Sequence, residues 1–275
     1  MRRETGRGRG GRDRREPRRN HAATSERRES PSGTTEWLYG RNAVRESLRA
    51  RRRGFRQLLL AQGMSRSEIV AEITRRAQEL RVPVQEVERA RLDELTEGAN
   101  HQGVCLLASR YPYEVLPNLM STRGDPFYLV LDSLQDPQNL GTVLRTAEAV
   151  AVTGVVMPRH RAAEVTPAVV NASAGAVEHL RVAQVVNLAR ALEELKESGV
   201  WVVGLEALPD AQPLWKVRLD GALALVVGSE GEGIRRLVLE KCDVVARLPL
   251  LGRVESLNAS TAAAVALYEA LRHRS

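Results

Sequence analysis

Residues 223–236 read LALVVGSEGEGIRR, an apolar run followed by a loop that contains three glycines. The run Leu223–Val227 is short, continuously apolar and bounded by a glycine, which is typical of a buried strand. Gly228 and Gly233 have the spacing of the G-x-x-x-x-G-K-[ST] loop, which leads from such a strand into a helix. The stretch therefore predicts a strand–loop–helix unit, the repeating element of an α/β fold.

The same loop lacks the groups that bind a phosphate. Ile234 and Arg235 stand where that loop type requires lysine and a hydroxyl residue, and Glu230 and Glu232 would repel a triphosphate. The dinucleotide pattern G-x-G-x-x-G fails as well, because Arg236 occupies the position of its last glycine. Two interpretations stay open: a turn that lets the backbone approach a flat, cationic ligand, or an ordinary strand-to-helix turn.

Strands and helices alternate on both sides of this stretch. Strand patterns cover residues 127–134, 154–158, 181–186, 200–207, 222–228 and 244–250. Helical patterns lie at about residues 140–150, 167–176, 188–197, 234–241 and 256–274. Short apolar strands that alternate with helices predict an α/β domain over residues 127–275, with a mainly parallel sheet covered on both faces. In such sheets ligands bind at the carboxyl ends of the strands.

A second, smaller α/β unit is predicted over residues 36–110. Its first helix is expected to begin near Asn42, a residue type suited to the N-cap. Further strand patterns cover residues 55–62, 82–88 and 103–110, and helical patterns cover residues 67–81 and 91–97. Residues 111–126 contain three prolines and little periodicity, which is typical of a linker.

The net charge of +7 is concentrated at the start of the chain. Residues 1–35 contain 11 Arg against 5 Asp or Glu, whereas the remaining residues hold 30 basic against 29 acidic side chains. This Arg/Gly-rich segment has too few apolar residues to form a core, so we expect a disordered basic tail. It is either an arm that follows RNA or DNA phosphates or a solvated tail of little consequence. Seven arginines within residues 41–56 form a second basic run, which is either an RNA contact or a solvated helix face.

Composition excludes several classes of protein. No run of 18 or more apolar residues occurs, so no membrane span is predicted, and no apolar segment follows the N-terminal arginines as in a secretory signal. The only cysteines, Cys105 and Cys242, lack the C-x-x-C spacing, which disfavours a disulfide framework. No cluster of metal ligands is visible. A reducing, cytoplasmic location fits these features best.

Two further loops at predicted strand ends carry polar residues. In the first, the Asp-Pro pair at 136–137 forces a turn, Asn139 begins a helix, and Arg145 follows nearly two turns later, where it could bind a phosphate or carboxylate. In the second, residues 247–261, Ser256 is placed to cap the last helix and leave its amides facing a ligand. By spacing alone, an exposed helix arginine is the favoured interpretation of Arg145, and the residues of the second loop could be turn and cap residues only.

Together the three loops resemble a known family. Residues 136–149 (DPQNLGTVLRTAEA), 223–236 and 248–272 (LPLLGRVESLNASTAAAVALYEALR) are similar, in order and separation, to the three motifs of the SpoU (TrmH-like) branch of the SPOUT methyltransferases. Residues 37–110, with YGRNAVRESL and NHQGV, resemble the small substrate-binding domain of the RlmB-like ribosomal RNA guanosine 2′-O-methyltransferases. The resemblance implies that the C-terminal domain is tied in a deep trefoil knot, a topology nearly absent among other folds.

The resemblance also implies a cofactor and a set of site residues. The cofactor is S-adenosyl-L-methionine, whose sulfonium is cationic and which carries no phosphate, and no metal is needed. The residues that match cofactor-binding positions are Leu205, Glu206, Ala207, Gly228, Leu248, Leu250 and Leu257. The residues that match catalytic positions are Asn139, Arg145, Glu230, Ser256 and Asn258. Gln138 departs from the histidine of many relatives, but it lies outside the reacting set.

The implied reaction transfers the sulfonium methyl to a ribose 2′-hydroxyl. A free hydroxyl is a poor nucleophile, so some group has to remove or stabilise its proton while the oxygen is held in line with the methyl. Arg145 has that role in family models, sometimes as the base itself. Because the pKa of a guanidinium is roughly 12 or above, we favour a charge that binds the substrate phosphate and stabilises the developing alkoxide.

Three functions remain open at this point. The expected one is methylation of a guanosine in 23S ribosomal RNA, and the alternatives are a transfer-RNA 2′-O-methyltransferase and a catalytically silent RNA-binding or ribosome-assembly protein. The small N-terminal domain favours ribosomal RNA, and the complete catalytic set disfavours a silent protein. The resemblance also implies a homodimer, and we expect its contact surface to be an apolar face of the last helix formed by Ala263, Leu267, Ala270 and Leu271.

Overall fold

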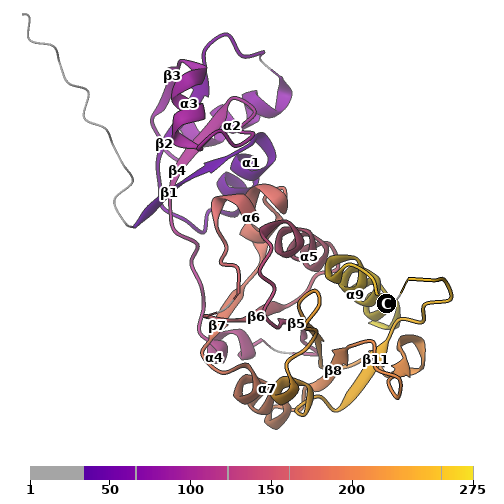
Figure 1. The fold of residues 1–275 in the computed structure, drawn as a ribbon. Helices are drawn as coiled ribbons and strands as arrows, with labels where there is room; N and C mark the ends of the chain where they lie inside the picture. Colours follow the sequence, from indigo (N-terminus) through magenta and orange to yellow (C-terminus); the bar gives the residue numbers. More distant parts are fainter. Residues whose placement is uncertain (1–33, 66, 123, 161, 255, 275) are drawn as a thin grey trace, which may run out of the picture. The chain divides into compact units, whose positions relative to one another are not determined.

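The described part of the chain forms two β-sheets with helices packed against them (Figure 1). The computed structural model describes residues 34–65, 67–122, 124–160, 162–254 and 256–274. The predicted basic tail, residues 1–35, therefore lies almost entirely outside the described residues. Both sheets belong to one compact unit of the chain.

The smaller sheet is formed by the first part of the described chain. Its strands are β1 (Thr35–Tyr39), β2 (Phe55–Ala61), β3 (Val84–Val87) and β4 (Val104–Ser109), in the spatial order β1-β4-β2-β3. Helices α1 (Arg41–Ala50), α2 (Glu68–Glu79) and α3 (Arg89–Leu95) connect them. The elements agree with the sequence-based prediction except for β1, which the pattern did not indicate. Helix α1 follows Gly40 directly, so the predicted N-cap at Asn42 is wrong.

The larger sheet carries the second part of the chain and is parallel, as predicted. Its strands are β5 (Phe127–Leu131), β6 (Gly154–Pro158), β7 (Val182–Val185), β8 (Trp201–Leu205), β9 (Gln212–Pro213), β10 (Leu223–Val227) and β11 (Val244–Arg247). Their order is β7-β6-β5-β10-β8-β11-β9, and each neighbouring pair runs parallel. Every residue of β5, β6 and β10 is buried, as expected for central strands between two helical layers.

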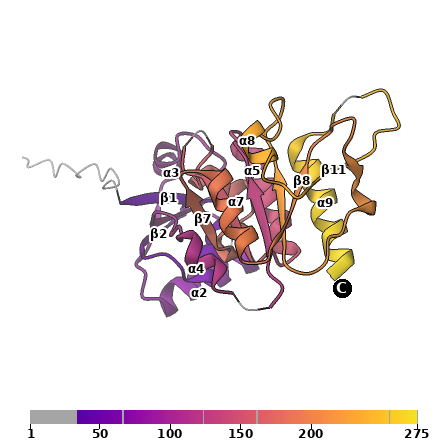
Figure 2. The same cartoon turned by 90° about the horizontal axis from the view of Figure 1, so that it is seen from below.

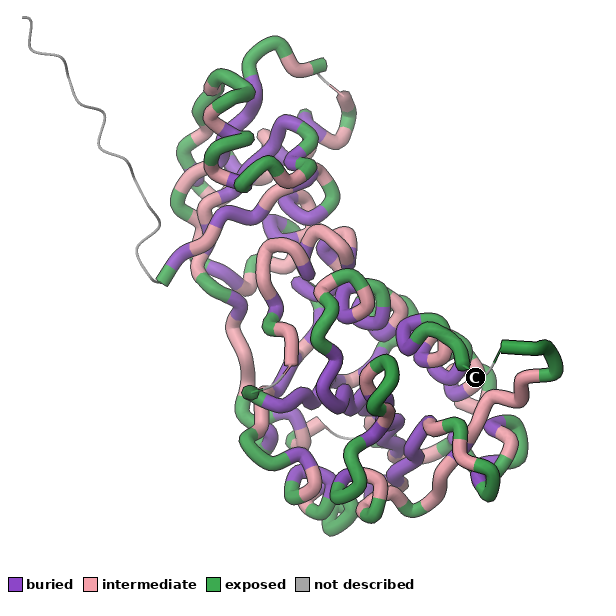
Figure 3. The backbone as a smooth tube through the Cα atoms, viewed as in Figure 1, coloured by how far each residue is buried: buried purple, intermediate pink, exposed green. Residues whose placement is uncertain are grey.

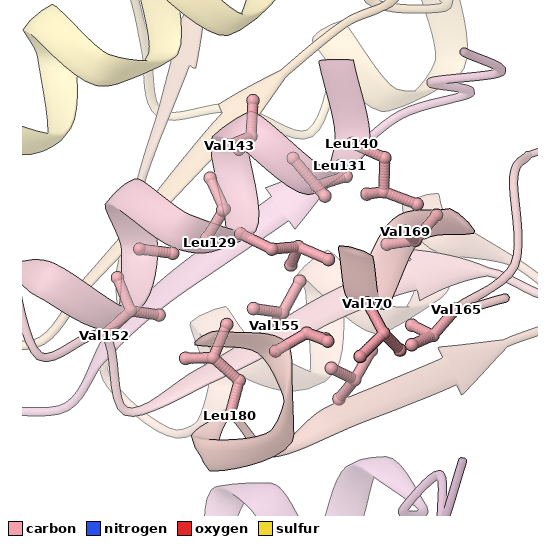
Figure 4. Close-up of a cluster of buried hydrophobic side chains, with 14 of the residues drawn as sticks. Leu129, Leu131, Leu140, Val143, Val152, Val155, Val165, Val169, Val170 and Leu180 are labelled. Carbon is pink, nitrogen blue, oxygen red and sulfur yellow. The ribbon is translucent and has the colours of Figure 1, made fainter. Parts of the chain in front are cut away.

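Helices cover both faces of this sheet (Figures 1 and 2). One face carries α5 (Pro137–Ala149), α6 (Pro167–Ala172), α9 (Ala259–Arg274) and the 3₁₀ turn η1 (Ala176–His179), whose apolar residues share a core with Leu129 of β5. Figure 4 shows Leu129, Leu140 and Val169 meeting in this core. The opposite face carries α4 (Leu116–Met120), α7 (Leu188–Glu197) and α8 (Arg236–Leu239), which pack on Val130 and its neighbours.

The described part of the segment predicted to be a linker, residues 111–122 and 124–126, packs against the large sheet. Leu116 and Leu119 of α4 are buried in the second core, and Glu114 forms an ion pair with Arg181 at 2.7 Å. Hydrogen bonds from Arg181 to Glu114 hold the pKa of this carboxyl below its usual value. The prolines that suggested a linker thus lie in a segment that packs as part of the domain.

Most of the basic run in residues 41–56 is engaged within the chain. Arg53 is fully buried, and its guanidinium binds Glu178 of η1 (2.7 and 2.9 Å) and Glu36 of β1. Arg52 donates to the Leu180 carbonyl and to the Tyr111 hydroxyl, and Arg49 pairs with a carboxylate of α2. Figure 3 shows that buried residues alternate with intermediate and exposed ones in this region. The arrangement favours a structural role for these arginines over an exposed RNA contact.

Candidate active site

A cavity of about 590 Å³ opens at the carboxyl ends of three adjacent strands, β10, β8 and β11. Parallel strands end at the same edge of the sheet, so the loops that follow them meet there. The cavity is lined by all seven residues expected at cofactor-binding positions: Leu205, Glu206, Ala207, Gly228, Leu248, Leu250 and Leu257. Glu230, Ser256 and Asn258 of the expected catalytic set also line it.

The glycine loop that opened the sequence analysis folds back on itself above this cavity. Ser229 and Gly233 exchange backbone hydrogen bonds of 3.2 and 3.1 Å, and the Glu206 carboxylate accepts the Ile234 amide at 2.7 Å. A Cβ placed on Gly228 would lie 2.1 Å from the carbonyl carbon of Gly233, so only glycine permits this closure. The loop therefore presents backbone groups and a carboxylate to a ligand, and no cation for a phosphate.

Three residues from distant motifs form one polar cluster at the cavity rim. The Asn258 side-chain amide donates to Asn139 Oδ1 at 3.0 Å and to Glu230 Oε1. Its Oδ1 accepts the amides of Ser260 (2.9 Å) and Thr261 (3.2 Å), which begin α9. Asn258 is thus the N-cap of α9, and the prediction that Ser256 caps this helix is wrong. The cap fixes the amide so that its donor faces Asn139 and Glu230.

Asn139 reaches the cluster because of how α5 begins. Asp136 caps the helix, accepting the amides of Gln138 at 3.2 Å and Asn139 at 3.0 Å. The helix starts at Pro137, so Asn139 lies within its first turn. The prediction that Asn139 begins the helix is therefore wrong. The proline suits the first helical position because its missing amide would have no partner there.

Two smaller hollows adjoin the cavity on the side of β5. The first, about 260 Å³, is lined by Ser229 and Glu230, which also line the main cavity, and by Asn139. The second, about 530 Å³, shares Glu232 with the first and extends to Arg235. The further residues that line them are Ser133, Leu134, Gln135, Asp136, Ala162 and Ala163.

The sequence analysis did not single out the residues of this second region. Ser133 and Gln135 follow β5 directly, so the rule that ligands gather at strand ends was the available signal. The fully buried Asp132 accepts the Arg235 amide (2.9 Å) and its Nε (2.7 Å). This contact ties the loop after β5 to the end of the glycine loop and fixes both walls of the hollows.

Comparison with known proteins decides the family. Residues 126–268 match the model of the SpoU rRNA methylase family, and residues 37–114 match the model for RNA 2′-O ribose methyltransferase substrate binding. This chain belongs to the SpoU methylase family.

Its relatives and structural neighbours agree. YacO of Bacillus subtilis, named as a TrmH family tRNA/rRNA methyltransferase, is 43% identical over 87% of this chain and 96% of its own length. A Staphylococcus aureus protein named for the same family is 41% identical over 86% of this chain and 96% of its own. A solved RNA 2′-O ribose methyltransferase is 28% identical, with a TM-score of 0.70 over 87% of this chain and 89% of its own. The AdoMet-bound rRNA methyltransferase of Sinorhizobium meliloti has the same fold, with 24% identity and a TM-score of 0.74 over 87% and 88% of the two chains.

One expected catalytic residue of this SpoU family member lies away from the polar cluster. Arg145 is exposed on α5, about 9 Å along the helix from Asn139 and about 120° around its axis. It lines neither the main cavity nor the two hollows, and its side chain makes no hydrogen bond or ion pair with another described residue. Ser256 lines the main cavity without joining the hydrogen bonds of the cluster.

The described residues offer neither a metal site nor a reactive thiol. No group of three potential metal ligands is found among them. Burial raises the pKa of the Cys105 and Cys242 thiols to about 12, so both stay protonated near neutral pH and are poor nucleophiles. No helix in the described ranges is long and apolar enough to cross a bilayer.

Proposed function

We propose that this SpoU family protein transfers a methyl group from S-adenosyl-L-methionine to the ribose 2′-hydroxyl of a guanosine in 23S ribosomal RNA. One observation carries the proposal: the cluster of Asn139, Glu230 and Asn258 stands between the main cavity and the adjoining hollows. A cofactor in the cavity and a nucleoside in the hollows would meet at this cluster.

The residues of the cavity fit this cofactor. Leu205, Leu248 and Leu257 offer an apolar surface for adenine, and the glycine loop brings backbone groups close to the ligand. The Glu230 carboxylate suits a cationic sulfonium, and no part of the cofactor requires a phosphate site. The cofactor supplies an electrophilic methyl group, and the chain's own residues bind it and position the ribose.

The chain's contribution to the chemistry is mainly orientation and charge. Asn258, held by its cap to α9, fixes the side chains of Asn139 and Glu230 so that they can position a ribose hydroxyl. Arg145 stabilises the negative charge that develops on the 2′-oxygen as its proton passes to solvent water. This role requires Arg145 to reach a cluster that it does not reach within the described chain.

A homodimer explains the position of Arg145. The predicted contact face of α9 is wrong, because Ala263, Leu267 and Ala270 are buried in the chain's own core. The exposed face of α9 instead carries Val265 (47% exposed) and Tyr268 (54% exposed), and α9 packs beside α5. We therefore propose that two copies pack through this face, and that each Arg145 serves the cluster of the other copy.

The choice of guanosine and ribosomal RNA rests on two features. The substrate-binding model matches residues 37–114, in addition to the methylase model. The Glu232 carboxylate lines both hollows and can accept two hydrogen bonds side by side, which matches the N1–H and N2–H donors of guanine. The C-terminal trefoil knot and the division of the chain into residues 1–35, 36–110, 111–126 and 127–275 belong to the same proposal, as does a cytoplasmic location.

Nucleotide-resolution mapping of 2′-O-methyl groups tests this function. Total RNA from cells with and without the gene is compared, and we expect one guanosine of 23S ribosomal RNA to lose its methyl group in the deletion strain. Loss of a methyl group from a transfer RNA instead would support the alternative suggested by the names of the relatives. Unchanged methylation of both RNAs, with normal cofactor binding, would point to a catalytically silent protein.

A further inference from the structure

Arg247 is an unpaired cation in the wall of the main cavity. It is the last residue of β11, and its Nε atom is buried without a hydrogen-bond partner. Four other buried side-chain polar atoms in the described residues lack a partner, but none of them belongs to a cavity-lining residue. Burial of an unpaired polar or charged group is costly, so a guanidinium in this position favours an anionic partner.

Within the described residues, no carboxylate forms an ion pair with Arg247. Strands β11 and β8 run parallel with Ala246 opposite Leu205, so the next residues, Arg247 and Glu206, follow at the same edge of the sheet. Nevertheless no ion pair joins them, and the Glu206 carboxylate accepts the Ile234 amide instead. The Glu206 carboxylate and the Arg247 guanidinium therefore lie in one cavity without forming an ion pair with each other.

The charges of the cavity wall complement those of the proposed cofactor. Among the described residues, the charged side chains that line the cavity are Glu206, Glu230 and Arg247, two anions and one cation. S-adenosyl-L-methionine carries two cations, the sulfonium and the α-ammonium, and one anion, the α-carboxylate. We propose that Arg247 binds the α-carboxylate of the methionine moiety, with the terminal nitrogens of its guanidinium donating to the two oxygens. This inference rests on the proposed function, because it takes S-adenosyl-L-methionine as the cofactor.

A comparison of two ligands separates this role from a structural one. S-adenosylhomocysteine retains the amino acid part of the cofactor, whereas 5′-methylthioadenosine lacks it and keeps the adenosine. Calorimetry would measure the affinity of the full-length protein for both ligands, in the wild type and in Arg247→Met, Arg247→Lys and Arg253→Met. Arg253 is an exposed arginine that does not line the cavity, so its variant is the matched control.

We expect Arg247→Met to weaken S-adenosylhomocysteine binding roughly 10- to 100-fold, the scale of a lost charge-assisted hydrogen bond. Binding of 5′-methylthioadenosine should change less than about twofold, and Arg247→Lys should recover only part of the loss because it lacks the planar fork. Equal weakening of both ligands, or no weakening of either, would overturn the role of Arg247. A wild-type protein that binds neither ligand would overturn the cofactor assignment itself, and with it this inference.

Discussion

At the residue scale, Asn258 joins two tasks in one side chain. Its oxygen caps α9 through the amides of Ser260 and Thr261, and its nitrogen donates to Asn139 and Glu230. Because Oδ1 of Asn258 accepts two amides of α9, its side chain is held in one orientation. The helix therefore sets the direction in which the side-chain nitrogen donates. The geometry of the proposed reacting groups therefore depends on the start of the C-terminal helix.

Two substitutions at position 258 separate these tasks. Asn258→Asp keeps the capping oxygen but sets a carboxylate against Glu230, so turnover should fall roughly 10²-fold with little change in unfolding free energy. Asn258→Ala removes the cap as well and should cost about 1 kcal/mol of stability. Urea unfolding and methyl transfer at saturating RNA measure the two effects. An Asn258→Asp protein with wild-type turnover would contradict the role of the donor.

Arg145 provides the second prediction at this scale. If its charge acts mainly in the transition state, Arg145→Ala should lower turnover by roughly two to three orders of magnitude. Cofactor affinity should stay unchanged, because Arg145 does not line the cavity. Arg145→Lys should restore little, since a point charge does not reproduce the planar guanidinium. Turnover above about a third of the wild-type rate, measured with RNA saturating, would show that Arg145 is an ordinary surface arginine.

At the element scale, the glycine loop depends on close approach of its two ends. Replacement Gly228→Ala places a Cβ 2.1 Å from the backbone of Gly233, and overpacking of this kind typically costs roughly 1–3 kcal/mol. We expect a lower melting temperature and weaker S-adenosylhomocysteine binding. Gly252→Ala is the matched control, because no atom lies within 4 Å of its added Cβ. If Gly228→Ala and Gly252→Ala have the same melting temperature and the same affinity for S-adenosylhomocysteine, the glycine loop accommodates the added Cβ without loss of stability.

The packing of η1 against the small sheet gives a second prediction at this scale. Arg53 and Glu178 form a fully buried ion pair, so Arg53→Met should leave an uncompensated buried carboxylate and cost about 3–5 kcal/mol. The double variant Arg53→Met with Glu178→Met should be markedly more stable than the single one. Urea unfolding measures both, and Arg49→Met, which breaks a more exposed pair with Glu72, is the control. If Arg53→Met loses no more unfolding free energy than Arg49→Met, the buried ion pair does not carry the stability expected of it.

At the scale of the whole molecule, the proposed dimer predicts complementation between inactive proteins. A mixed dimer of Arg145→Ala and Asn139→Ala subunits contains one site with an intact cluster and an intact arginine from the other copy. Subunits that exchange freely should therefore regain about a quarter of wild-type activity, one active site in half of the dimers. Methyl transfer after co-refolding measures this. Absence of recovery in verified mixed dimers would show that Arg145 acts within its own chain.

Several features of the protein were determined by the sequence alone. The alternation of short apolar runs with helical patterns predicted a mainly parallel α/β sheet, and the parallel pairing of the strands in the large sheet confirms it. Three local motifs identified the SpoU family, and the resemblance named seven residues, four of them within these motifs, that line one cavity. These features are readable because strand and helix periodicity and glycine turns act over a few residues.

Other features were decided only by the tertiary structure. Asn258 contacts Asn139, which lies 119 residues earlier in the chain. No local pattern indicates that Asn258, and not Ser256, caps α9. The apolar stripe of α9 looks the same in sequence whether it covers the core or a partner, and here Ala263 and Leu267 cover the core. Likewise, positions 53 and 247 are both arginine. Arg53 is buried in an ion pair with Glu178, whereas Arg247 lies in a cavity wall and its Nε has no partner. The partner of a polar or apolar group is set by which distant segments pack beside it, because hydrogen bonds and burial act through space and not along the chain.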